Sequence, residues 1–257
     1  MLSFHYISLL IIGSLTLTAY AAPPPLSLSN LELREELGMP WIDVKFDNPQ
    51  ILEGKDKKTF SKKLSGITID EKLPVEPHNS YGLYTLKGRY KFRTASKYIM
   101  KIMLPIDNDA KAAEAFGEVK ALKIVGDLVD SGLFTDLARG FENAPVIIMK
   151  KKSGEVLSTT TAFKAAVAGK DVALQTQMKS EALKLMCAEV ARIAYKKKVL
   201  HDDNHENNVL VTLRGNTVIS VELVDWGPQG TYQINKKLVT QAEIEHWCID
   251  GWKNEWK

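Results

Sequence analysis

Residues 199–227 read V-L-H-D-D-N-H-E-N-N-V-L-V-T-L-R-G-N-T-V-I-S-V-E-L-V-D-W-G, and this stretch decides how the chain is interpreted. An acidic loop precedes two apolar runs separated by Arg214-Gly215-Asn216, a pattern typical of a β-hairpin. Asp203 and Asn208 stand before the first run, and Asp225 directly follows the second. The open ends of a hairpin lie side by side, so three oxygen-bearing side chains are expected to meet there. Such oxygens suit Mg²⁺, and the stretch predicts a magnesium site facing phosphate.

The rest of the chain predicts strands followed by helices. Alternating apolar residues and turn signals predict strands over 81–86, 89–93, 97–104 and 145–149, the first three forming a meander. Helical spacing of apolar residues predicts helices over 110–130, 160–168, 174–198 and 239–256. This order indicates an α+β fold with a small β-rich lobe, a helical lobe and a cleft between them.

Three short motifs carry a resemblance to a known superfamily. His201, Asp203 and Asn208 fit the spacing H-x-D-x-x-x-x-N, and the sequence Asp225-Trp226-Gly227 fits D-F-G with Trp for Phe. Lys101 ends a strand segment, Y-I-M-K, that is similar to V-A-I-K. In this order, residues 81–227 resemble the protein-kinase-like superfamily, including its small atypical and aminoglycoside-phosphotransferase-like branches. The resemblance implies a two-lobed kinase-like domain over 78–257, with a β-rich N-lobe (78–150) and a reduced helical C-lobe (151–257).

The resemblance also implies a site for ATP and Mg²⁺ in which each polar residue of the opening stretch has a separate role. Asp225 and Asn208 are the expected metal ligands, through a carboxylate and an amide oxygen. Asp203 is expected to orient the attacking hydroxyl and accept its proton. His201 is expected to brace the loop rather than take part in the chemistry. Catalysis of this kind depends on positioning and charge neutralisation.

The β-rich lobe is expected to supply the remaining contacts to the nucleotide. Lys101 is predicted to reach the α- and β-phosphates and to pair with a helix acid, Glu118, or one turn earlier Glu114. The adenine contacts are predicted at Ile148, Met149 and Lys150, where the strand at 145–149 leads into a hinge.

Two departures from the family pattern leave the function open. No G-x-G-x-x-G motif precedes Lys101, since only Gly82 and Gly88 are available, and the 30 residues 228–257 leave little room for peptide-binding helices. One hypothesis is a secreted kinase that transfers the γ-phosphate of ATP to an unknown hydroxyl acceptor, a protein or a small molecule. The alternative is a secreted pseudokinase, an interaction protein that uses the kinase scaffold without catalysis.

A zinc site is a further alternative for the acidic loop. Its candidate ligands are His201, Asp202, His205 and Glu206. Two His residues four apart share a metal when a helix brings them to one face, whereas Asp-Asp-Asn-His-Glu-Asn-Asn is typical of a loop. The composition therefore favours the nucleotide site over zinc.

The N-terminus predicts export. An apolar run at 7–17 precedes Ala19-Tyr20-Ala21, a small-x-small pattern typical of signal-peptide cleavage, so residues 1–21 are interpreted as a signal peptide. Residues 22–77 are interpreted as a partly disordered N-terminal extension. The expected location is extracellular, with no membrane contact after cleavage.

Charge and cysteine content narrow the class of partner and compartment. The net charge of +3 and the scattered basic residues do not predict nucleic-acid binding. Cys187 and Cys248 are the two cysteines; they either pair or remain as buried free thiols, and the secretory context favours the disulfide.

Overall fold

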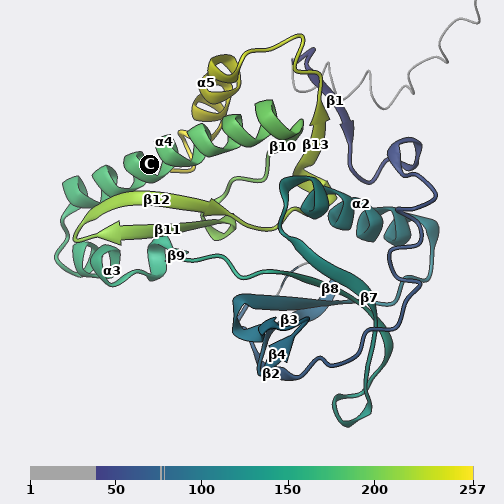
Figure 1. The fold of residues 1–257 in the computed structure, drawn as a ribbon. Helices are drawn as coiled ribbons and strands as arrows, with labels where there is room; N and C mark the ends of the chain where they lie inside the picture. Colours follow the sequence, from purple (N-terminus) through teal and green to yellow (C-terminus); the bar gives the residue numbers. More distant parts are fainter. Residues whose placement is uncertain (1–38, 76, 78, 257) are drawn as a thin grey trace, which may run out of the picture.

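The computed structural model describes residues 39–75, 77 and 79–256 (Figure 1). Within these residues the protein has the α+β fold expected from the sequence, with helices and several antiparallel sheets. The predicted signal peptide, residues 1–21, lies outside the described residues, as does the segment 22–38. None of the described helices has the length and apolarity needed to cross a membrane.

A five-stranded antiparallel sheet forms the β-rich part of the fold. Its strands are β2 (Ile69–Lys72), β3 (Ser80–Leu86), β6 (Tyr98–Met103), β7 (Leu128–Asp136) and β8 (Phe141–Lys150), in the order β2-β3-β6-β8-β7. The side chains of β6 alternate between the two faces of the sheet. Met100 and Ile102 contribute to one apolar cluster, while Lys101, which is in register with Ile147, faces the other way. Ile147 belongs to the main core, so Lys101 points toward that core.

The expected three-strand meander is wrong in its middle strand. β3 pairs directly with β6, and residues 89–94 instead form a separate hairpin of β4 (Arg89–Tyr90) and β5 (Arg93–Thr94). Lys91 and Phe92 both have left-handed backbone conformations, with φ of 47° and 65°. These two residues reverse the chain before a long strand can form.

The helix expected over 110–130 ends earlier than predicted. α2 (Asp109–Val125) begins after Asn108, whose side chain accepts a hydrogen bond from the Lys111 N–H at 2.9 Å. It ends at Gly126, which caps the helix in the left-handed conformation with φ of 92°. Residues 128–130 are therefore the start of β7, a strand that the helical composition concealed.

The helical part of the fold contains the predicted hairpin. Its helices are α3 (Thr161–Ala168), α4 (Val172–Lys197) and α5 (Gln241–Trp252), and its hairpin consists of β11 (Val209–Arg214) and β12 (Thr217–Leu223), to which β9 (Glu155–Val156) adds a third strand. α4 contacts both β12 and α5, and it lies between them in Figure 1. The predicted helices and the predicted hairpin are thus present, although α5 is shorter than expected.

Residues 39–75, which were expected to form part of an N-terminal extension, join the fold through a three-stranded sheet. It consists of β1 (Ile42–Lys45), β13 (Thr231–Ile234) and β10 (Val199–His201), in the order β1-β13-β10. Trp41, Ile42 and Phe46 belong to the main core, and β2 pairs with β3. Residues 39–75 are therefore an integral part of the folded body, because their apolar side chains are buried by pairing with later strands. Short 3₁₀ turns join several elements, at Pro49–Ile51, Ala95–Lys97, Leu137–Arg139, Leu157–Thr159, Glu206–Asn208 and Pro228–Gly230.

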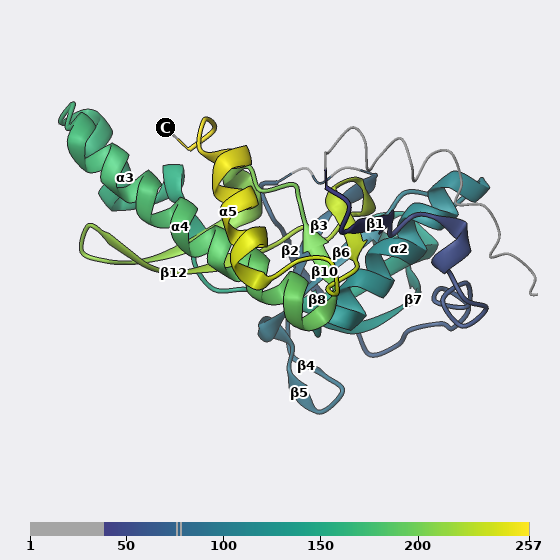
Figure 2. The same cartoon turned by 90° about the horizontal axis from the view of Figure 1, so that it is seen from above.

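A disulfide joins the two longest elements of the helical part. Cys187 on α4 and Cys248 on α5 are bonded, with an S–S distance of 2.10 Å and a Cα–Cα distance of 5.4 Å. Seen from above, α5 lies against α4 (Figure 2). The disulfide predicted from the secretory context is confirmed, and the alternative of two free thiols is wrong.

Candidate functional site

The expected ion pair between Lys101 and Glu118 is present. Lys101 Nζ lies 2.9 Å from Glu118 Oε1 and 2.8 Å from Oε2. The alternation of β6 aims Lys101 at α2, whose inner face carries Glu118. Both residues are buried, with exposed fractions of 5% and 4%. The fallback acid, Glu114, instead accepts a hydrogen bond from Asn79 Nδ2 at 2.7 Å.

The negative charge of Asp225 acts on the Lys101–Glu118 ion pair. Burial acts to lower the pKa of Lys101, but the negative charges of Glu118 and then Asp225 outweigh it, so the pKa is raised. The ammonium group therefore stays protonated. A buried ion pair contributes little to stability because its desolvation offsets its attraction. Perturbed charges from separate elements that converge in this way are a mark of functional sites.

The acidic loop after β10 is fixed by Asn208. Its Nδ2 donates to the Asp203 backbone carbonyl and to Asp203 Oδ2, both at 2.9 Å. Because the nitrogen end of the amide faces Asp203, the oxygen end is the one that could serve as a metal ligand. The Val224 N–H, next to Asp225, donates to the Asn208 backbone carbonyl at 3.0 Å, and carboxylate and amide oxygens are ligands of the kind that Mg²⁺ prefers.

His201 braces the turn that carries Asp225. Its Nε2 lies 2.9 Å from the Val224 carbonyl and 3.0 Å from the Asp225 carbonyl. The ring is 1% exposed, and burial lowers its pKa, so the imidazole is neutral with its proton on Nε2. The geometry fits the supporting position expected for this residue.

The Asp225 turn is held in an unfavourable backbone conformation. Asp225 has φ of 60°, and the Gly227 N–H donates to Asp225 Oδ1 at 3.3 Å. Left-handed conformations of non-glycine residues are uncommon and concentrate at functional sites. Trp226 is buried and packs edge-on against His201, with ring centroids 4.8 Å apart. The Trp226 side chain thus fills the core behind the turn.

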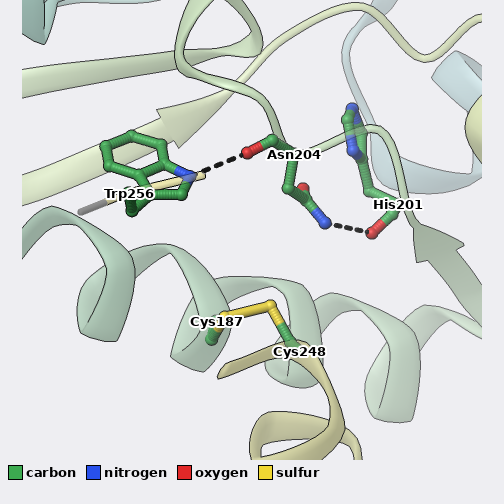
Figure 3. The surroundings of a disulfide bond; sticks show 5 residues. All are labelled: Cys187, His201, Asn204, Cys248 and Trp256. Atoms are coloured by element: carbon green, nitrogen blue, oxygen red, sulfur yellow. Dashed lines mark hydrogen bonds between the residues drawn. A yellow bond between two sulfur atoms is a disulfide. The ribbon is translucent and has the colours of Figure 1, made fainter. Parts of the chain in front are cut away.

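The C-terminal end of the chain supports the acidic loop, and the sequence did not predict this. Trp256 Nε1 donates to the Asn204 carbonyl at 3.0 Å, and Asn204 Nδ2 donates to the His201 carbonyl at 2.8 Å (Figure 3). Trp252 forms a side-chain hydrogen bond with Asp202. The disulfide fixes α5, which leads into this segment. The tryptophans at 247, 252 and 256 are the signal that could have pointed to it.

Asp202 is an acid of this loop whose pKa is strongly raised. Burial, followed by the charge of Asp203, raises its pKa to about 7, although Lys45 and Trp252 act to lower it. Lys45 belongs to β1, so the segment that was expected as an extension contributes charge to the site.

Close packing at Gly230 sets the position of Asp203. A Cβ at Gly230 would lie 2.4 Å from the Cβ of Asp203, closer than real Cβ atoms approach. The Gly230 carbonyl also accepts a hydrogen bond from the Asp202 N–H at 2.7 Å. The segment after the Asp225 turn is thereby pressed against the loop that carries Asp203.

Unsatisfied polar atoms gather around the same loop. Within the described residues, the buried side-chain atoms without a hydrogen-bond partner are His201 Nδ1, Asn204 Oδ1 and Trp226 Nε1. All three atoms belong to the loop and the turn that carry Asp203 and Asp225.

Ile148, one of the predicted adenine contacts, lies in the middle of β8, where it is poorly placed to contact a ligand. This residue is fully buried and is in register with Met100 on one side and Asp130 on the other. A central strand uses its backbone groups in the sheet, so Ile148 has none to offer a ligand. Met149 is also in register with residues on both sides, and the Lys150 N–H donates to the Asp127 carbonyl at 2.9 Å. A backbone-recognised ligand fits better beyond the end of β8.

The glycines available before Lys101 do not form a phosphate-covering loop. Gly82 lies within β3, in register with Ile102, and Gly88 follows the end of that strand. The connection between β2 and β3, residues 73–79, contains Pro74 and Pro77 and no glycine.

The zinc alternative finds no support in the described part of the chain. There, no group of three or more His, Cys, Asp or Glu side chains is close enough to hold a metal ion. His201 Nε2 already faces two backbone carbonyls.

Comparison of the sequence with protein-family models and with curated proteins finds no match in either.

Proposed function

We propose that this protein is a kinase-like phosphotransferase that binds Mg-ATP and transfers the γ-phosphate to a hydroxyl acceptor. The observation that carries the proposal is the buried Lys101–Glu118 pair with the Asp225 charge close to it. These three residues come from β6, from α2 and from the end of the β11–β12 hairpin. Lys101 and Glu118 are buried whereas Asp225 is exposed, and stability alone gives little reason to bury such an ion pair.

Each residue has a distinct task in the proposed reaction. Glu118 holds the Lys101 ammonium in place, and Lys101 neutralises charge on the α- and β-phosphates. Asp225 and Asn208 are the ligands for Mg²⁺, which supplies further charge neutralisation when bound. Asp203, with its carboxylate fixed by Asn208, orients the acceptor hydroxyl and takes its proton. Phosphoryl transfer needs little more from a protein than this positioning.

The arrangement of elements supports a two-lobed, kinase-like interpretation of the α+β fold. The strand that carries Lys101 is the middle strand of the five-stranded sheet, and α2 follows it directly in sequence. The loop with Asp203 and the hairpin that ends at Asp225 come from the helical part. We place the nucleotide between these two parts.

Export belongs to the same proposal. The Cys187–Cys248 disulfide is typical of an oxidising compartment, which supports secretion after removal of residues 1–21.

The test is transfer of radiolabelled γ-phosphate from ATP to the protein itself and to mixtures of protein and small-molecule acceptors. The intact protein is expected to transfer label in the presence of Mg²⁺, and Asp203→Asn is expected to abolish the transfer. Asp70→Asn, which alters an exposed acid in a weak surface ion pair, is the matched control and should retain full activity. Transfer that survives in Asp203→Asn contradicts the assigned role.

A second candidate function is a kinase-like scaffold that binds a partner without catalysis. The glycine-free connection at 73–79 favours it, because a phosphate-covering loop requires close approach of the backbone. This candidate predicts that no acceptor is labelled under any condition. Nucleotide binding without transfer supports a pseudokinase, whereas transfer that depends on Asp203 excludes one.

A further inference from the structure

The turn of the β4–β5 hairpin requires a left-handed backbone conformation, yet bulky residues occupy it. Tyr90 is in register with Arg93, so Lys91 and Phe92 are the two central residues of the turn. Both have positive φ, 47° and 65°. Turns of this kind strongly prefer Asn-Gly, because other side chains are strained there. Folding alone therefore favours a different residue at position 92.

Phe92 is almost completely exposed. Its exposed fraction is 92%, the highest among the exposed large hydrophobic residues of the described chain. The β4–β5 hairpin projects from the body of the protein (Figure 2). An aromatic side chain that is both strained and unburied contributes nothing to the core, which suggests a contact outside the chain.

The hairpin is firmly attached at its base through Asp130 on β7. Tyr90 donates its hydroxyl hydrogen to Asp130 Oδ2 at 2.7 Å, and Lys91 and Lys62 form ion pairs with the same carboxylate. Although burial acts to raise it, hydrogen bonds from Lys62, Lys91 and Tyr90 lower the pKa of Asp130 to about 2. The exposed tip is thus presented by a fixed support.

A basic hollow of about 960 Å³ lies beside the hairpin. Its cationic lining residues are Arg89, Arg93, Lys97, Lys150, Lys151 and Lys152, and no Asp or Glu lines it. Lys152 forms ion pairs with Asp127 and Glu222. Within the described residues, Lys97, Lys150 and Lys151 form no ion pair, so their charges face the hollow uncompensated.

We propose that the β4–β5 hairpin and this hollow form a docking surface for a membrane that carries anionic phospholipids. Phe92 enters the interfacial layer, and the cations beside it bind the phosphates of the lipid headgroups. The projecting aromatic side chain suits the apolar part of the membrane interface, and the Lys and Arg side chains without ion-pair partners suit the anionic headgroups above it. Single-stranded nucleic acid fits less well, because it calls for several aromatic side chains on which successive bases stack. The proposal replaces the expectation of no membrane contact and does not depend on the proposed phosphotransfer.

The test is co-sedimentation of the intact protein with vesicles of phosphatidylcholine, with and without phosphatidylserine. Binding is expected only to vesicles with phosphatidylserine, and it should weaken as salt is added. Phe92→Asn and the double variant Lys150→Glu/Lys151→Glu should each lower binding by about tenfold or more. Leu137→Asn, which changes another exposed apolar residue (71% exposed), is the control and should bind as the parent does.

A stability measurement separates loss of docking from loss of fold. Asn accepts the left-handed conformation more readily than Phe, so Phe92→Asn should melt at the same temperature as the parent or higher. Equal binding to both kinds of vesicle contradicts the proposal, as does unchanged binding of the two docking variants. Binding to polyglutamate or single-stranded DNA in place of vesicles also overturns it, and would assign the surface to an acidic protein or to nucleic acid.

Discussion

The two halves of the candidate site are held in place by different physical means. On the sheet side, Lys101 and Glu118 are fixed by burial and by each other, within a strand and a helix that are close in sequence. On the helical side, Asp203 and Asp225 lie on loops and depend on hydrogen bonds from Asn208, His201 and the C-terminal segment. The first half is part of the core, whereas the second half depends on hydrogen bonds within the loop and on a contact from the distant Trp256. Substitutions on one side of the site should therefore affect that side and leave the other in place.

The largest effect is expected from removal of the acid in the buried pair. Glu118→Ala leaves the Lys101 ammonium buried without its partner, which should lower the free energy of unfolding by about 3–5 kcal/mol. Urea denaturation measures this change. Glu114→Ala, which loses one partly exposed hydrogen bond to Asn79, is the control and should cost about 1 kcal/mol. Equal losses for the two variants contradict a buried ion pair at Glu118.

Removal of the disulfide should act on the helical half. The double variant Cys187→Ala/Cys248→Ala opens a link between residues 61 apart, and it should cost about 4 kcal/mol of stability. Hydrogen exchange is expected to increase in α5 and in the loop at 202–208, but not in β6 or α2. Uniform loosening of all these elements contradicts the separation of the two halves.

The pH dependence of stability should reveal Asp202. Its pKa is raised from 3.8 to about 7 in the folded state, so the folded state holds a proton that the unfolded state has released. The resulting stabilisation is complete below about pH 4 and is lost as the pH rises to about 7, a change of about 4 kcal/mol. His201 has the opposite sign: its lowered pKa reduces stability as the pH falls below 6.5. Asp202→Asn should remove the first trend alone, which denaturation at several pH values can detect.

A smaller effect is expected from the hydrogen bond between Trp256 and the Asn204 carbonyl. Trp256→Phe removes the donor and keeps most of the apolar packing, so it should cost about 1–2 kcal/mol of stability. If Asn204 positions Asp203, the variant should lower the rate of phosphotransfer with little change in the KM for ATP. Trp247→Phe, which alters a tryptophan packed against Trp41, is the control. An equal loss of rate in both variants assigns the effect to α5 as a whole.

The motif resemblance pointed to Lys101 and Glu118, and local geometry explains why the two side chains meet. The alternation of β6 fixes the direction of Lys101, and α2 carries Glu118 on its buried face. The turn at 214–216 brings Asp225 back toward Asp203 and Asn208. In each case the determining residues lie within one strand, helix or hairpin.

The sequence could not predict contacts that depend on distant segments. Nothing in Trp256 indicates that its indole N–H reaches the Asn204 carbonyl, and nothing in β1 indicates that it pairs with β13. The end of α2 was misplaced because Ser131-Gly132 was taken as the stop signal, whereas Gly126 caps the helix. Ile148 was predicted as an adenine contact because the sequence does not show that β8 lies between two other strands of the sheet.

Thermal unfolding with ATP, with and without Mg²⁺, tests the central claim most directly. Nucleotide at 100 times its dissociation constant should stabilise the parent protein by about 2.7 kcal/mol, and only when Mg²⁺ is present. Asp225→Asn should lose this stabilisation, while Asp203→Asn should retain it, because Asp203 is assigned to the acceptor rather than to the nucleotide. Absence of any Mg-dependent stabilisation in the parent, or equal stabilisation of Asp225→Asn, would contradict a Mg-ATP site between the two halves.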